Sequence, residues 1–96
     1  MPLKVELSVA AEEDLLAAWN YISHDDMDAA DALLDRVAAV CRKLADWPDL
    51  GRERLDLGQE MRSFPVETHV VYYRVNSEIV EVVRVLHGRR DVDAVL

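Results

Sequence analysis

At 96 residues the chain has room for one hydrophobic core, which predicts a single domain over residues 1–96. About half of its residues are apolar and about a third are charged, a balance that excludes a disordered or membrane-embedded chain. The net charge of −8 argues against broad binding to nucleic acid, whose phosphates attract clustered lysine and arginine.

The acidic residues gather in the first part of the chain. Up to Asp35 a single base, Lys4, stands against nine acids, so this part carries the whole net charge and the remainder is neutral. A local arginine site therefore fits only the second part. The sequence lacks a membrane-length apolar run and a signal-peptide pattern, so we expect a cytoplasmic protein. With Cys41 as its single cysteine, it predicts no disulfide, no metal site and no cofactor.

The first predicted elements are a strand and two helices. Residues 3–7 alternate apolar and polar side chains, which predicts a strand with one buried face. Ser8 is the expected cap of a helix over residues 9–22, whose early acids, Asp14 among them, suit its positive end and a solvated face. After a polar turn with a capping Asp, a second amphipathic helix ends at Trp47-Pro48. So short a turn predicts an antiparallel helical hairpin.

The second half predicts a loop over residues 48–60 and then three strands. Pro65 lacks an N–H group, so its strand is expected at an edge, whereas the nearly all-apolar third strand is expected at the centre. Asp91 is the expected cap of a short C-terminal turn. The three strands are expected over residues 63–67, 69–75 and 79–86.

The element order βααβββ with a short C-terminal turn predicts an α+β fold, in which a helical hairpin packs on a mainly antiparallel four-stranded sheet. The pattern leaves the place of the first strand in the sheet open. Tyr72 and Tyr73 are adjacent in a strand and should face opposite ways. His24 and His69 show no ligand spacing and are assigned surface roles.

Six stretches carry a family resemblance: LSVAAEEDL (7–15), WNYI (19–22), LADWPDLGR (44–52), MRSFPV (61–66), VYYRV (71–75) and VLHGRRD (85–91). In this order and spacing they resemble toxins of the ParE kind, in the RelE/ParE superfamily, almost end to end. The resemblance implies a toxin–antitoxin system toxin that a ParD-like antitoxin neutralises in a hetero-oligomer, a heterotetramer or larger. It also implies that the free toxin inhibits DNA gyrase by binding, without direct contact to nucleic acid.

An enzymatic alternative rests on three residues of the second half. In the RelE group, ribosome-dependent mRNA endonucleases use basic residues to stabilise the cleaved phosphodiester. Arg62 and Arg90 resemble two of these, and His87 is a candidate general acid–base. No Tyr, His or Lys follows Arg90, where those enzymes commonly place a catalytic side chain. We therefore expect a protein-binding toxin with no catalytic residue, and Arg62 and Arg90 paired with acids of a partner or of this chain.

Two candidate binding surfaces follow. The gyrase-facing candidates are three arginines and the C-terminal tail: Arg62, Arg89, Arg90, Val95 and Leu96. The antitoxin-binding candidates are apolar and mostly lie in or beside the long loop: Trp19, Trp47, Leu50, Leu55, Leu57, Met61 and Phe64. The same apolar residues equally predict a satellite cluster packed under the loop. A third hypothesis is a degenerate member that only binds its antitoxin.

Overall fold

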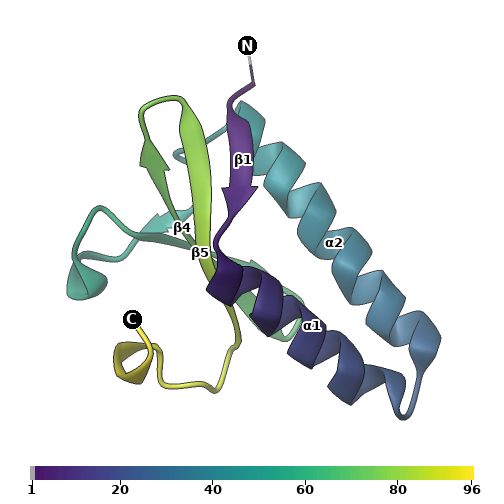
Figure 1. Ribbon diagram of the computed structural model, residues 1–96. Helices are drawn as coiled ribbons and strands as arrows, with labels where there is room; N and C mark the ends of the chain where they lie inside the picture. Colours follow the sequence, from purple (N-terminus) through teal and green to yellow (C-terminus); the bar gives the residue numbers. More distant parts are fainter. Residues whose placement is uncertain (1) are drawn as a thin grey trace.

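The computed structural model describes residues 2–96 as a helical layer against one side of a sheet (Figure 1). β1 (Lys4–Leu7) leads directly into α1 (Val9–Ser23), and a short turn joins α1 to α2 (Met27–Asp46). The expected helical hairpin is confirmed.

Both α-helices begin at a side-chain cap. The Ser8 hydroxyl accepts the backbone N–H of Ala11 at 3.0 Å, and the Asp26 carboxylate accepts that of Ala29 at 3.0 Å. Asp91 does the same for the last turn, accepting from the N–H of Asp93. The first amides of a helix lack partners within it, so such caps set where a helix starts. All three caps agree with the sequence predictions.

The sheet has five strands in the order β1-β5-β4-β3-β2. β1 runs parallel to β5, and the other neighbours are antiparallel. The α+β class and mainly antiparallel sheet are confirmed, but the expected four strands are wrong by one, since the order is βααββββ. A two-residue strand inside the long loop is too short to leave a periodic pattern. The remaining strands are β2 (Arg52–Glu53), β3 (Arg62–Val66), β4 (His69–Asn76) and β5 (Ile79–His87).

The central and edge positions follow the sequence predictions in part. β5 lies between β1 and β4 and is therefore an interior strand with a neighbour on each side, although β4 is the middle strand of the five. β1 takes one edge of the sheet. β3 is not the other edge along its whole length, because Arg62 and Ser63 pair with β2. At Pro65 the strand has passed the end of β2, so the residue that cannot donate a hydrogen bond lies where no neighbour requires one.

Apolar side chains pack on both faces of the sheet. The larger core lies between the sheet and the two helices, with Leu33, Leu44 and the fully buried Tyr73 among its members. A smaller core on the opposite face includes Tyr72 and Met61, and the C-terminal 3-10 turn (Val92–Ala94) contributes to it. Tyr72 and Tyr73 therefore face opposite ways, as predicted.

A buried ion pair ties α1 to β5 of the sheet. Asp14 accepts from Arg84 Nε at 2.7 Å and from Nη2 at 2.8 Å, and it also accepts the backbone N–H of Val85 at 3.0 Å. The two side chains are only 11% and 17% exposed. Arg84 thus has the partner that an arginine in an apolar strand requires. The expected solvated role of Asp14 is wrong, because its neighbour in space comes from a strand 70 residues away.

Candidate functional site

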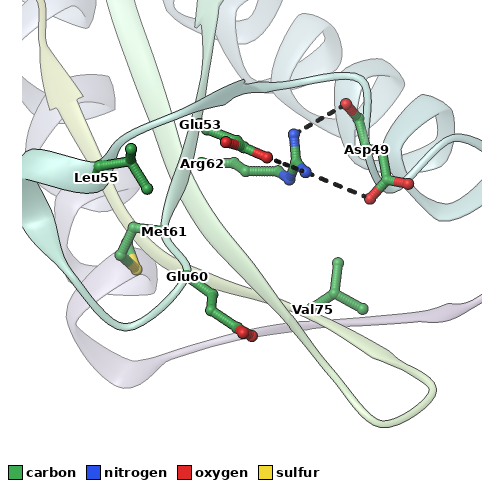
Figure 2. A pocket seen from close by; sticks show the side chains of 7 residues that line it. All are labelled: Asp49, Glu53, Leu55, Glu60, Met61, Arg62 and Val75. Atoms are coloured by element: carbon green, nitrogen blue, oxygen red, sulfur yellow. Dashed lines mark hydrogen bonds and ion pairs between the residues drawn. The ribbon is translucent and has the colours of Figure 1, made fainter.

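Arg62 begins β3, and its guanidinium reaches the segment that follows α2 (Figure 2). Its Nη1 donates to the carbonyl oxygens of Asp49 at 3.1 Å and Gly51 at 2.8 Å. Its Nη2 lies 3.3 Å from Glu53 Oε1 and 3.6 Å from Asp49 Oδ1. The structure thus gives Arg62 acidic and carbonyl partners within this chain.

The pocket beside Arg62 has a volume of about 410 Å³ and is acidic. Figure 2 shows the carboxylates of Asp49, Glu53 and Glu60 around it, against the one guanidinium of Arg62. Its formal charge is therefore −2, and the rest of the lining is apolar. The three carboxylates would repel the negative charge of a phosphate, so the binding of a phosphate in this pocket is unfavourable.

Tyr73 also holds the segment that follows α2, through two hydrogen bonds of its hydroxyl. Its hydroxyl donates to the carbonyl oxygen of Pro48 at 2.8 Å and accepts the N–H of Gly51 at 2.8 Å. Burial raises the pKa of the Tyr73 hydroxyl above its usual value, so the group stays a neutral donor. Together with Arg62, it anchors residues 48–51 to the sheet. The conformation of the segment that presents Trp47 and Leu50 is therefore held by the fold.

The apolar antitoxin-binding candidates divide into exposed and covered groups. Trp47, Leu50 and Leu55 are 67%, 45% and 85% exposed, and we call them the apolar shelf. Trp47 and Leu50 line a shallow hollow together with Asp49, which also lines the pocket that contains Leu55. Asp49 is therefore the residue that the two hollows share.

The other candidates pack inside the molecule. Met61 is buried in the smaller core and Leu57 packs against it, as the satellite-cluster alternative predicts. Phe64 packs on the larger core instead. Trp19 is half-buried, and its Nε1–H donates to Asp31 of α2 at 2.9 Å, which ties the helical hairpin together. These four residues have structural contacts within the chain.

The structure brings Arg89, Arg90 and His87 together at the end of β5. The N–H of Arg90 donates to the carbonyl oxygen of His87 at 2.9 Å, and the N–H of Arg89 donates to His87 Nδ1 at 3.1 Å. All three side chains are exposed. In the C-terminal tail, Leu96 is exposed and Val95 packs partly against the smaller core.

Arg62 lies far from this end. It pairs with Tyr73, which in turn pairs with Val82, and His87 lies five residue steps farther along β5. At about 3.3 Å per strand residue, that is a separation of about 16 Å along the sheet. The three residues of the nuclease alternative, Arg62, His87 and Arg90, therefore do not converge on one phosphate.

His69 is buried, so its expected surface role is wrong. It begins β4, and its ring meets that of His87 edge-on, with centroids 5.4 Å apart. Its Nδ1 lies 3.0 Å from the Thr68 hydroxyl. Burial lowers the pKa of His69, the neighbouring His87 lowers it further, and Asp14 opposes both.

His69 makes the fold sensitive to mild acid. Its lowered pKa means that the unfolded chain binds this proton more tightly, so the free energy of unfolding falls as the pH drops below about 6.5. In urea denaturation between pH 7.5 and 5.5, we expect His69→Gln to flatten that dependence. His24→Gln, at an exposed position, should leave it unchanged. Parallel slopes for His69→Gln and the unmodified chain would contradict this assignment.

Sequence reasoning missed a set of exposed apolar residues on the helices. They lie along α1 and at the start of α2: Val9, Leu16, Tyr21 and Met27. The available signal was the composition of α1, whose apolar residues are too many for a single stripe facing the core.

Residues 2–96 contain neither a candidate metal site nor a candidate membrane-spanning helix. This part of the chain holds no cluster of three or more histidine, cysteine, aspartate or glutamate side chains that could bind a metal ion. None of the helices described here combines the length and the apolar character needed to span a membrane.

The sequence of this chain matches a known protein family. A family model described as "ParE toxin of type II toxin-antitoxin system, parDE" matches residues 5–92. Toxin ParE3 of Caulobacter vibrioides is 38% identical over 73 residues, which cover 76% of this chain and 73% of that toxin.

Solved structures share the fold. The chromosomal ParDE toxin–antitoxin system from P. aeruginosa matches with a TM-score of 0.74 at 16% identity, over 88% of this chain and 95% of the other. The toxin–antitoxin complex RelBE2 from Mycobacterium tuberculosis matches with a TM-score of 0.59 at 20% identity, over 91% and 99%. At these identities the likeness concerns the fold alone. The family model, however, matches nearly the whole sequence, and the chain therefore belongs to the ParE toxin family of type II toxin–antitoxin systems.

Proposed function

We propose that this chain is a single-domain toxin that acts in the cytoplasm by inhibiting DNA gyrase, and that it acts by binding and breaks no covalent bond. We further propose that a ParD-like antitoxin neutralises it in a heterotetramer or a larger complex. The family supports the general role, and the matched structures are of toxin–antitoxin complexes. The observation that carries the non-enzymatic reading is the environment of Arg62.

A phosphate-binding arginine needs free donors and an environment that favours an anion. The donors of Arg62 instead meet the carbonyls of Asp49 and Gly51 and the carboxylate of Glu53. Freeing the guanidinium for a phosphate would leave three carboxylates around the incoming negative charge. The cost of that arrangement favours a structural role for Arg62.

The apolar shelf is the surface that we assign to the antitoxin. Trp47 and Leu50 expose large apolar side chains on or beside the segment that Tyr73 and Arg62 hold in place, and Leu55 exposes a third farther along the loop. A preordered apolar surface loses little conformational entropy on binding, and tryptophan is among the side chains that contribute most at interfaces. The open edges at β1 and at the Pro65 end of β3 offer places for a strand of the partner.

Trp47→Ala should weaken the complex with the antitoxin about thirtyfold or more, as removal of a central interface tryptophan does. Because Trp47 is exposed, the free energy of unfolding should change by less than about 0.5 kcal/mol. Calorimetric titration with the product of the adjacent antitoxin gene measures the first quantity, and urea denaturation the second. Leu16→Ala, an exposed apolar position on α1, is the matched control. Equal affinity for both variants would place the antitoxin elsewhere.

For gyrase we propose the surface formed by Arg89, Arg90 and Leu96, which are exposed, and the partly covered Val95. Arg89 and Arg90 are adjacent and lie just beyond the end of β5. Arg62, the other sequence candidate, lies about 16 Å away along the sheet by the strand spacing, so it joins this surface only if the target is large.

Expression of the gene in cells tests the proposal. Induced alone, it should arrest growth with DNA breaks and an SOS response, and coexpression of the antitoxin gene should prevent both. His87→Ala should remain toxic, because the proposed mechanism has no proton transfer. Codon-linked cuts in translated mRNA that disappear in His87→Ala would establish the RelE-type endonuclease, the alternative that the fold shared with the RelBE2 complex keeps in view. Absence of any arrest would indicate a member that only binds its antitoxin.

A further inference from the structure

A cleft of about 510 Å³ opens where α1 meets the start of β4 and the end of β5. Ala17, Ala18 and Ile22 of α1 line one side, and Val85 and Leu86 of β5 line the other. The exposed Tyr21 also lines it. An apolar cleft of this size accommodates a large aliphatic side chain and its flanking backbone.

The one carboxylate in the lining is already engaged. Asp14 accepts three hydrogen bonds, two from Arg84 and one from the N–H of Val85, so its charge is balanced inside the protein. The other side chains with polar groups at this opening are Arg90, His69, His87, Thr68 and Tyr21. None of these carries a negative charge, in a chain whose net charge is −8.

His87 presents a donor at this opening. Its Nδ1 accepts the backbone N–H of Arg89, so the neutral ring carries its proton on Nε2. His69 packs edge-on against the same ring and holds it beside the cleft.

Arg90 is the unbalanced charge of the site. Within residues 2–96, its side chain makes no ion pair, and the same holds for Arg42, Arg52 and Arg89, but among these four only Arg90 lines the cleft. An unpaired guanidinium beside an apolar cleft favours a ligand that brings both a carboxylate and an apolar group, because a charge-assisted hydrogen bond is strongest where water is excluded.

We propose that this cleft takes an acidic segment of the antitoxin, with an aliphatic side chain between α1 and β5 and a neighbouring Asp or Glu carboxylate on Arg90 and His87. This inference rests on the proposed function for the identity of the partner. Charge complementarity selects the occupant, since a basic or purely apolar segment would leave Arg90 unpaired on binding. A segment seated here covers Arg90, so the antitoxin and gyrase compete for the same arginine.

Three capped tetrapeptides test the site on the full chain labelled with ¹⁵N: acetyl-Asp-Leu-Leu-Glu-amide, acetyl-Lys-Leu-Leu-Lys-amide and acetyl-Asp-Gly-Gly-Glu-amide. In an NMR titration, the first should shift the amides of residues 17–22 and 85–90. It should also bind about tenfold or more tightly than the other two, since a charge-assisted contact and an aliphatic side chain each contribute about that factor. Equal binding of all three, or shifts confined to other surfaces, would overturn the inference.

Arg90→Glu should reverse the preference between the acidic and the basic peptide. Arg42→Glu makes the same charge change at an exposed position of α2 that does not line the cleft, and the preference should then stay. If both variants behave alike, long-range charge accounts for the binding and the site is refuted. If the chain poisons gyrase but shows no preference for the acidic peptide, this inference alone is refuted. If it prefers the acidic peptide but affects neither gyrase nor growth, the proposed function alone is refuted.

Discussion

Asp14→Ala should lower the free energy of unfolding by about 3–5 kcal/mol, the usual cost of removing one member of a buried ion pair. The substitution leaves the 17%-exposed Arg84 without its carboxylate and the N–H of Val85 without its acceptor. It also removes a tie between α1 and β5, an interior strand of the sheet. Urea denaturation at neutral pH measures the loss.

An exposed ion pair provides the control for that prediction. Arg36 and Glu67 lie 3.2 Å apart, but each side chain is more than half exposed, so Arg36→Ala should cost less than about 1 kcal/mol. If Asp14→Ala were no more destabilising than Arg36→Ala, the Asp14–Arg84 pair would not hold the helical layer to the sheet.

Gly51→Ala should destabilise the fold by about 1–3 kcal/mol, as overpacking of a well-packed core does. A Cβ atom at this position would lie 2.5 Å from the Tyr73 hydroxyl oxygen and 2.6 Å from its Cε1. Tyr73 is fully buried, so it has no room to withdraw. The segment that carries Trp47 and Leu50 must move instead, and antitoxin affinity should fall together with stability.

Gly88→Ala is the matched substitution without a clash. Its Cβ would have the Thr68 carbonyl oxygen as its nearest neighbour, at 3.4 Å, an ordinary contact. Thermal denaturation of both variants compares them directly, and their midpoints should differ by about 5 °C or more. Equal midpoints would show that residues 48–51 yield readily and that Tyr73 does not anchor them.

The parts of the fold that depend on neighbours in sequence could be predicted. Ser8, the capping Asp of the helical hairpin and Asp91 each satisfy amides two or three residues away, so a local pattern is enough to find them. The apolar run of β5 likewise indicates a strand covered on both faces.

The parts of the fold that depend on residues distant in sequence could not be predicted. The sequence indicates that Arg84 needs a partner, but nothing in it selects Asp14, which resembles the other acids of the first helix. β2 exists only because β3 lies beside it, and two residues carry no period. His69 is buried through contacts with Thr68 and His87 that its flanking sequence does not specify.

The candidate site shows the same division. The loop residues could be identified as apolar, but which of them face solvent depends on the path that Tyr73 and Arg62 impose on the chain. Met61 thus turns inward while Leu55, six residues earlier, stays 85% exposed. The cleft beside Arg90 joins residues of α1 to residues near the C-terminus, and no motif spans that separation.

The central claim is that this protein disables its target by contact, with no bond-breaking side chain. It is tested by mixing the purified, antitoxin-free chain with DNA gyrase and supercoiled plasmid, and in parallel with translating ribosomes. The account predicts linear DNA held in a gyrase cleavage complex, from the unmodified chain and from His87→Ala alike, and intact messages on the ribosomes. Cleaved messages with the unmodified chain, intact messages with His87→Ala and unaffected gyrase would contradict it.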